Sequence, residues 1–194
     1  MIYYDIFLVI LFSYLSGSIP FGYLFAKLFL KKDVRKIGSG NTGATNVLRV
    51  GNKSLAFLTL FFDIIKAIAP VLFFKFYIPD YVYISSLSVF LGHVFPIWLK
   101  FKGGKGVATY LGILFALNFY YAVIFILSWL IIIFITKYVS IGSLVSSLIV
   151  LLFNVYFEGF NESIMLFIFL VLIIYSHRTN IGRLKAGFEN KINL

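Results

Sequence analysis

The sequence predicts an all-α polytopic membrane protein with seven transmembrane helices and polar loops clustered on the cytoplasmic side. Its mean hydropathy is +1.01, and only 12% of its 194 residues are charged. A water-soluble domain of this length could not bury so much apolar surface. Long apolar runs alternate with short basic segments, which is the pattern of membrane helices joined by cytoplasmic loops. The length favours one domain over residues 1–194.

The apolar runs define the expected helices. The first covers residues 6–30, where the small pair Ser13 and Gly17 allows close helix packing. A structural role is favoured for these small residues, with Ser16 and Ser18 as candidates to line a polar cleft, and Pro20 is expected to kink the helix. Further helices are expected at residues 54–76, 81–99, 107–136, 140–157 and 163–176.

The run at 107–136 can form one long helix or two short ones. We prefer two, with a break near Asn118, because two crossings keep Lys137 on the basic side. Each piece is short for a hydrocarbon core about 30 Å thick, which normally needs about 20 residues. One piece is therefore expected to be tilted, partly inserted or shielded by its neighbours.

The charges are distributed asymmetrically. Seven crossings place all of the 17 Lys and Arg residues except Lys66 and Lys75 on one side of the membrane. Because the basic side is the cytoplasmic one, the C-terminus is expected in the cytoplasm and the N-terminus on the outer side. The chain has a formal net charge of +10. Because of this distribution, its expected partners are the lipid bilayer and anionic substrates, and nucleic acid is not expected as a partner. Asp63 and Lys66 lie three residues apart within one apolar run and can pair. Their role is open between a structural ion pair and a functional site.

Cysteine is absent and only two histidines occur. Disulfides and thiol catalysis are thereby excluded. The spacing of His and Glu does not match a metal site, so neither a metal nor another cofactor is expected.

Residues 38–46 read G-S-G-N-T-G-A-T-N and carry no large apolar side chain. The glycines leave backbone N–H groups accessible, and with nearby cations such a loop suits a phosphate or another small anion. The dinucleotide fingerprint G-x-G-x-x-G also fits, but it requires a preceding strand and is rejected. A flexible linker is the remaining alternative. The expected substrate-binding residues here are Ser39, Gly40, Asn41, Thr42, Gly43, Thr45, Asn46 and Arg49.

Two further polar stretches accompany this loop, at residues 100–109 and 177–189. In the first, glycines precede a helix start, where unpaired N–H groups favour an anion. It is not a Walker A loop, because the first glycine is missing and Gly106 replaces the Ser or Thr. We expect the membrane scaffold to bring the three stretches together.

These stretches, in this order, resemble the bacterial acyl-phosphate:glycerol-3-phosphate acyltransferase family. The first matching motif is G-S-I-P-F-G at 17–22, which leads into residues 38–49. The second joins G-H-V-F-P at 92–96 with F-K-G-G-K-G-V-A-T at 101–109. The third is H-R-T-N-I-G-R-L at 177–184, with Gly187 and Glu189 after it. The resemblance covers nearly the whole chain.

The resemblance implies an enzyme of the bacterial inner membrane whose active site faces the cytoplasm. It would transfer a fatty acyl group from acyl phosphate to the 1-hydroxyl of glycerol 3-phosphate, giving lysophosphatidic acid and phosphate. The second glycine-rich loop would serve acyl phosphate. The resemblance implies binding or catalytic roles for Ser39, Arg49, Lys105, Ser143, His177 and Asn180. The last four of these are the expected catalytic set. We add as substrate-binding positions Gly103, Gly104, Gly106, Thr109 and Arg183.

The acylation requires a base for the hydroxyl proton. Asp33 and Glu189 are expected to pair with cations, which makes them poor bases. His177 is the best protein candidate by type, but a phosphate monoester has a second pKa of about 6 and can accept the proton itself. We favour this substrate-assisted route, with protein groups positioning the phosphate. His93 is expected to be structural, supporting the second glycine loop.

A transporter of organic phosphates is the main alternative function. Transporter sites usually lie near the bilayer midplane, often between inverted repeats with broken helices. Here the polar groups gather at one face, apart from Asp63 and Lys66, which favours the acyltransferase.

Overall fold

The computed structural model describes residues 2–192, and the regular structure in that range is helical. The chain divides into two compact units, of which the first ends at Leu117 and the second begins at Asn118. Each unit is described by itself. The expectation of one domain over residues 1–194 stays a prediction.

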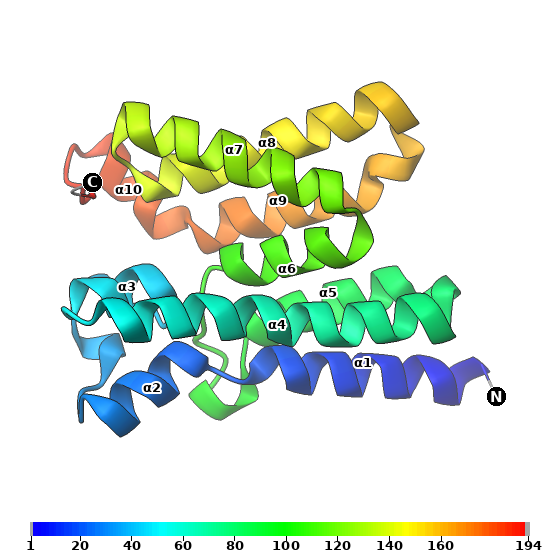
Figure 1. The fold of residues 1–194 in the computed structure, drawn as a ribbon, viewed down its shortest axis with the longest axis horizontal. Helices are drawn as coiled ribbons and strands as arrows, with labels where there is room; N and C mark the ends of the chain where they lie inside the picture. The colour runs from blue at the N-terminus through cyan, green and yellow to red at the C-terminus, as the bar shows by residue number, and fades with distance from the viewer. Residues whose placement is uncertain (1, 193–194) are drawn as a thin grey trace. The chain divides into compact units, whose positions relative to one another are not determined.

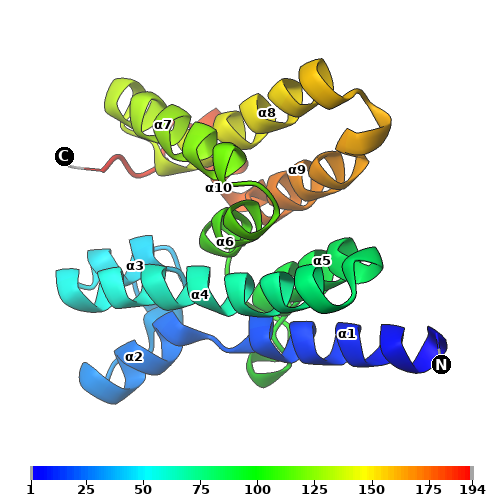
Figure 2. The same ribbon diagram turned by 45° about the vertical axis from the view of Figure 1, so that its right-hand side comes forward.

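Three long helices run side by side in the first unit (Figures 1 and 2). They are α1 (Ile2–Ser18), α4 (Lys53–Tyr77) and α5 (Val82–Val94). The shorter α6 (Val107–Leu117) packs along α4. The end of α4 near Lys53 carries the short elements that form the first glycine loop.

Small residues bring α1 and α5 into close contact. A methyl group at Gly17 would collide with the backbone carbonyl of Val89 on α5. The hydroxyl oxygens of Ser13 and Ser85 lie 2.9 Å apart across the same interface. The packing predicted from Ser13 and Gly17 is therefore confirmed.

The first apolar run is broken and not merely kinked. α1 ends at Ser18, and α2 (Phe21–Phe29) begins just after Pro20, because proline lacks the N–H that a continuous helix would need. The chain then forms the 3-10 turn η1 (Val34–Lys36) and the short helix α3 (Ala44–Arg49).

The run at 107–136 forms two helices, as expected. α6 ends at Leu117, and α7 (Phe119–Thr136) starts with Asn118 as its N-cap, whose Oδ1 accepts from the N–H of Tyr120 at 2.9 Å. The last carbonyls of α6 are satisfied by Lys75, whose Nζ donates to Ala116 O and Leu117 O at 2.8 Å each. With 11 residues, α6 is about 16 Å long, roughly half of a bilayer core.

The second unit contains α7, α8 (Val139–Glu158) and α9 (Ile164–Ser176). α8 packs against both of the others (Figure 1). At His177 the chain bends by 59° into α10 (Arg178–Lys185). The remaining 3-10 turns are η2 (Pro79–Tyr81), η3 (Ile97–Leu99) and η4 (Asn161–Ser163).

Within residues 2–192, five helices are apolar and long enough to cross a membrane, or six if the bent pair α9 and α10 counts as one span. The five are Tyr4–Phe29, Lys53–Tyr77, Pro79–Leu99, Phe119–Thr136 and Val139–Glu158. A seventh crossing would require the short α6. The predicted count of seven and the cytoplasmic position of the loops therefore stay predictions.

Candidate active site

The first glycine loop is built around the side chain of Asn46, which is only 2% exposed. Its amide nitrogen donates to the carbonyls of Val34, Ile37 and Asn41 at 2.9, 3.0 and 2.9 Å. Its amide oxygen accepts from the N–H of Ser39 at 2.9 Å. Asn46 thus holds the loop in shape, while its direct role in substrate binding stays a prediction.

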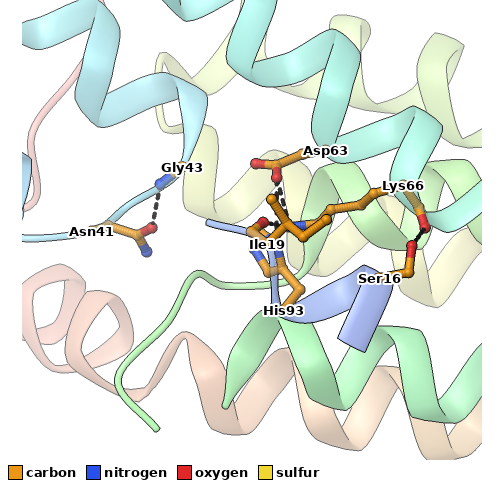
Figure 3. A network of polar contacts seen from close by, with 7 residues as sticks. All are labelled: Ser16, Ile19, Asn41, Gly43, Asp63, Lys66 and His93. Carbon is orange, nitrogen blue, oxygen red and sulfur yellow. Dashed lines mark hydrogen bonds and ion pairs between the residues drawn. The ribbon is translucent and has the colours of Figure 1, made fainter. Parts of the chain in front are cut away.

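Glycine is needed at two positions of this loop. Gly38 and Gly40 have φ angles of +60° and +72°, in the left-handed region that other residues rarely adopt. Gly43 instead caps α3, and its N–H donates to Asn41 Oδ1 at 2.8 Å (Figure 3). Asn41 therefore also serves the loop's own backbone.

The loop lies directly on α2. A methyl group at Gly22 would collide with the carbonyl oxygen of Thr42, so the two backbones are in contact. Thr42 is buried, whereas Ser39 and Thr45 are half-buried. Arg49 is exposed, and its role in binding an anion stays a prediction.

The second glycine loop folds back along the end of α5. The N–H groups of Gly103 and Gly104 donate to the carbonyls of Val94 and His93, both at 3.1 Å. A methyl group at Gly104 would collide with the imidazole of His93. The sequence predicted that these N–H groups face an anion, but in the structure both are bonded to α5.

The rest of the second loop leads into α6. Gly106 has a φ of +83°, and a methyl group there would collide with the ring of Phe90. Lys105 is half-buried. Thr109 is buried, and its hydroxyl has no hydrogen-bond partner within residues 2–192. The three glycines of this loop therefore have a packing role, and their contact with substrate stays a prediction.

A small pocket of about 180 Å³, counting its open part, lies in the first unit between these features. The first glycine loop contributes Thr42 to its lining, and His93, which packs on Gly104 of the second loop, also lines it. The first glycine loop therefore borders the pocket directly, whereas the second adjoins it only through His93. The lining comprises residues 17–21, Thr42, Asp63, Lys66, His93 and Pro96.

A buried ion pair lies against this pocket (Figure 3). Lys66 Nζ is 2.7 Å from Asp63 Oδ1, and both side chains are 3% exposed. Lys66 Nζ also donates to the carbonyl of Ile19 at 2.7 Å. The pairing that the spacing of Asp63 and Lys66 allowed is thereby confirmed.

His93 supports the second glycine loop, as expected. The support runs through its own carbonyl, which accepts from Gly104, and through its ring, which fills the space beside that glycine. His93 Nδ1 lies 3.7 Å from Asp63 Oδ1, too far for a hydrogen bond.

Three of the predicted residues of the second unit, Ser143, His177 and Asn180, are buried, and Arg183 is half-buried. Ser143 Oγ donates to Val139 O at 3.0 Å and accepts from Trp129 Nε1 at 3.3 Å. His177 Nδ1 lies 2.8 Å from Ile173 O. Because a carbonyl only accepts, Nδ1 carries a proton, and Nε2 is the acceptor in the neutral ring.

Asn180 and Arg183 hold the carboxylate of Glu189. Asn180 Nδ2 donates to Glu189 Oε1 at 2.5 Å, and Arg183 Nε donates to Oε2 at 2.7 Å. Ser140 Oγ adds a third bond, to Oε1 at 3.0 Å. Asn180 Oδ1 is buried without a hydrogen-bond partner among the described residues. The C-terminal segment is thus tied to α8 and α10.

The two carboxylates considered as bases are both held ionised. Burial would raise the pKa of Glu189, but hydrogen bonds from Asn180, Arg183 and Ser140 outweigh it and hold that pKa below its usual range. The hydrogen bond from Arg35 lowers the pKa of Asp33 to about 2. The expected pairing of both carboxylates with cations is confirmed, and both are poor bases at neutral pH.

The predicted set of binding and catalytic residues omits Asp63, Lys66 and His93. Charge within an apolar helix was the signal for the first two, since such groups point to a functional site by default. Of the two serines suggested to line a polar cleft, Ser18 lines the pocket and is fully buried. Ser16 is not in the lining and instead donates to the carbonyl of Lys66.

The class of protein follows from the fold. An all-helical chain with five apolar helices long enough to cross a bilayer is an integral membrane protein. Its polar features in the first unit are two glycine loops and a pocket lined by Thr42 of the first loop, by His93 and by a buried ion pair.

Comparison with known proteins identifies the family. The protein-family model described as "Glycerol-3-phosphate acyltransferase" matches residues 7–187. A glycerol-3-phosphate acyltransferase of Pelagibacter ubique (strain HTCC1062) is 58% identical over 187 residues, covering 96% of this chain and 97% of the relative. One from Mesorhizobium japonicum is 48% identical over 190 residues, with 97% of each covered.

Solved structures agree. The crystal structure of PlsY (YgiH), an integral membrane glycerol 3-phosphate acyltransferase, in its glycerol 3-phosphate form matches with a TM-score of 0.92 and 38% identity. The lysophosphatidic acid form matches with a TM-score of 0.87 and 38% identity. Each match covers 97% of this chain and 96% of the other. The chain belongs to the glycerol-3-phosphate acyltransferase family.

Proposed function

We propose that this protein transfers a fatty acyl group from acyl phosphate to the 1-hydroxyl of glycerol 3-phosphate. The products are lysophosphatidic acid and inorganic phosphate, which makes this the first acylation of phospholipid synthesis. The observation that carries the proposal is the family match over residues 7–187, which includes the first two polar stretches and the third as far as Gly187. The acceptor and the product are further supported by the two forms in which PlsY was solved. The donor rests on the resemblance of the motifs.

The charges of the first unit suit two phosphate-bearing substrates. Arg49 is exposed beside the first glycine loop, and Lys105 lies between the last glycines of the second. A guanidinium or an ammonium near a phosphate forms charge-assisted hydrogen bonds, which are stronger than neutral ones. We assign Arg49 and Lys105 to phosphate binding, together with Ser39.

The second unit supplies groups for the acceptor. Asn180 Oδ1 is a buried acceptor that the bond to Glu189 leaves unused, and it suits a hydroxyl of glycerol 3-phosphate. Ser143 and His177 are assigned to orienting the phosphate. Such positioning, together with favourable electrostatics, can carry much of an acyl transfer.

The proton of the attacking hydroxyl is assigned to the phosphate of glycerol 3-phosphate, directly or through a water. Its second pKa is about 6, so the dianion dominates at neutral pH. Acyl phosphate contains a good leaving group, so no protein acid is needed to expel it. The Nδ1–H tautomer of His177 leaves its Nε2 as an acceptor, which makes His177 the rival base.

A pH–rate series distinguishes the two bases. His177→Asn and His177→Ala should raise KM or lower kcat. The acidic limb of the pH–rate profile, which reports protonation of the phosphate, should persist in both variants. If both variants keep substrate affinity but lose turnover by about 10⁴-fold, and the titrating limb vanishes, His177 is the base and the substrate-assisted route is wrong.

The decisive test of the activity uses purified protein in lipid nanodiscs with acyl phosphate and glycerol 3-phosphate. We expect lysophosphatidic acid and phosphate to form in equal amounts. Acyl-CoA in place of acyl phosphate tests the donor. Uptake of glycerol 3-phosphate into sealed vesicles, without any acylated product, would instead identify a transporter.

We further propose seven crossings of the bacterial inner membrane, with the polar loops in the cytoplasm. The support is the positive-inside pattern of the basic residues. Because the chain has no cysteine, single cysteines can report sidedness. Gly43→Cys, Lys102→Cys and Lys185→Cys should resist an impermeant thiol reagent in intact cells and react after lysis. Labelling in intact cells would reverse the orientation.

A further inference from the structure

We propose that the buried Asp63–Lys66 pair is a positioning unit, which sets the geometry of both glycine loops for turnover and is not required for folding. The inference concerns residues of the first unit only. It deepens the proposed function and rests on it, because one of its readouts is acyl transfer.

Lys66 joins α4 to the break between α1 and α2. Its Nζ donates to the carbonyl of Ile19 at 2.7 Å, within the break itself. Its own carbonyl accepts from Ser16 Oγ, on the last turn of α1, at 2.8 Å. Figure 3 shows both bonds reaching the same short stretch of chain. The break at Pro20 is therefore held from α4 by side chain and backbone together.

The position of this break determines where the first glycine loop lies. α2 starts at Phe21, directly after the break, and the Lys66 ammonium lies 5.8 Å from the centre of the Phe21 ring. One residue later, Gly22 is in direct backbone contact with Thr42 of the loop. A shift of the break would move α2 and, with it, the Thr42 side of the pocket.

Asp63 connects the pair to the second glycine loop. Its Oδ1 lies 2.7 Å from Lys66 Nζ and 3.7 Å from His93 Nδ1. His93 in turn seats Gly104, through its carbonyl and its ring. The ion pair thus lies against Ile19 and His93, the residues that place the two loops.

Energetics favour a positioning role over a folding role. Both side chains are 3% exposed, and removing two charges from water costs more than a buried pair commonly recovers. Replacing such a pair by apolar residues of similar volume is often neutral or stabilising. In contrast, a displacement of about 1 Å in positioned groups can lower a rate by about 100-fold.

The test is the double variant Asp63→Leu/Lys66→Met, which removes both charges and leaves neither unpaired. We expect kcat to fall by about 10- to 100-fold, with KM for both substrates within about threefold and an unchanged fraction of folded protein. The matched control is Lys75→Met, on the same helix. That lysine also donates to carbonyls, but it lies outside the pocket lining, so kcat should stay at the wild-type value.

A second variant keeps the charge. Lys66→Arg retains a cation beside Asp63, but a planar guanidinium is larger than an ammonium and presents its donors in a different geometry. We expect it to fold normally and to lose kcat by a smaller factor than the double variant. A double variant that does not fold, or normal turnover in Lys66→Arg, would overturn the proposal.

A readout without catalysis separates this inference from the proposed function. Thr42 is 4% exposed, so a cysteine introduced by Thr42→Cys should react slowly with a thiol reagent. Its labelling should accelerate about tenfold or more in the Asp63→Leu/Lys66→Met background and stay slow with Lys75→Met. Faster labelling in a protein whose parent transfers no acyl group would refute the function and keep the inference. Unchanged labelling in the double variant refutes the inference, and so does unchanged kcat when the parent protein transfers acyl groups.

Discussion

Replacing Asn46 with alanine should open the first glycine loop while the long helices stay folded. The Asn46 side chain is 2% exposed and forms four hydrogen bonds with the backbone between Val34 and Asn41. Alanine would leave three carbonyls and the N–H of Ser39 without these partners. Because α3 has only six residues, it offers little structure of its own to keep the loop in place.

The magnitude follows from the bonds that are lost. An intramolecular hydrogen bond contributes a net of about 0.5–1.5 kcal/mol, and the amide nitrogen shares two hydrogens among three acceptors. Taking about 0.5–1 kcal/mol for each of the four contacts gives about 2–4 kcal/mol of local stability. Asn46→Asp should cost at least as much, since it retains the acceptor for Ser39 but turns a negative oxygen toward three carbonyls.

Hydrogen exchange at the Ser39 amide measures this opening directly. A loss of about 2 kcal/mol corresponds to exchange about 30-fold faster, and larger losses to more. The control is Asn52→Ala, which removes a single capping bond to the Leu55 N–H at the start of α4 and costs about 1 kcal/mol. Asn52→Ala should not alter the rate of hydrogen exchange at the Ser39 amide. Exchange at Ser39 within threefold of wild type in Asn46→Ala would refute the reasoning.

The other predictions concern the second loop, the C-terminal segment and the cations. Gly104→Ala should destabilise the first unit by about 1–3 kcal/mol in thermal unfolding, because its methyl group collides with the imidazole, whereas Gly182→Ala, with open space around it, should be neutral or stabilising. The pKa of Glu189 is lowered in the folded protein, so its contribution to stability is present above the ordinary glutamate pKa and is lost as the pH falls through the lowered value. Hydrogen exchange of the amides in the C-terminal segment should therefore become faster in acid, and Glu189→Gln should abolish that pH dependence. Arg49→Ala and Lys105→Ala should each raise KM or abolish activity without changing the melting temperature, and near-normal kinetics in both would place the phosphate site elsewhere.

Local chemistry was sufficient to predict the helices and the polar stretches. Pro20 lacks an N–H and Asn118 caps the following helix, so both breaks could be anticipated from the residue types. Ser13 and Gly17 indicated a close helix contact, and the spacing of Asp63 and Lys66 indicated a pair. Each of these features depends on neighbours within a few residues of one another, or on how closely a small side chain lets a helix approach.

The partners of the polar groups depended instead on contacts between distant parts of the chain. The N–H groups of Gly103 and Gly104 are bonded to the end of α5, although their sequence context is typical of an anion site. Asn46 is used by the loop backbone, and Lys75 satisfies the carbonyl of Leu117, 42 positions away. A hydrogen-bonding group has the same capacity for a ligand, a carbonyl or a neighbouring helix, and only the packing of the helices determines which of these lies within 3 Å.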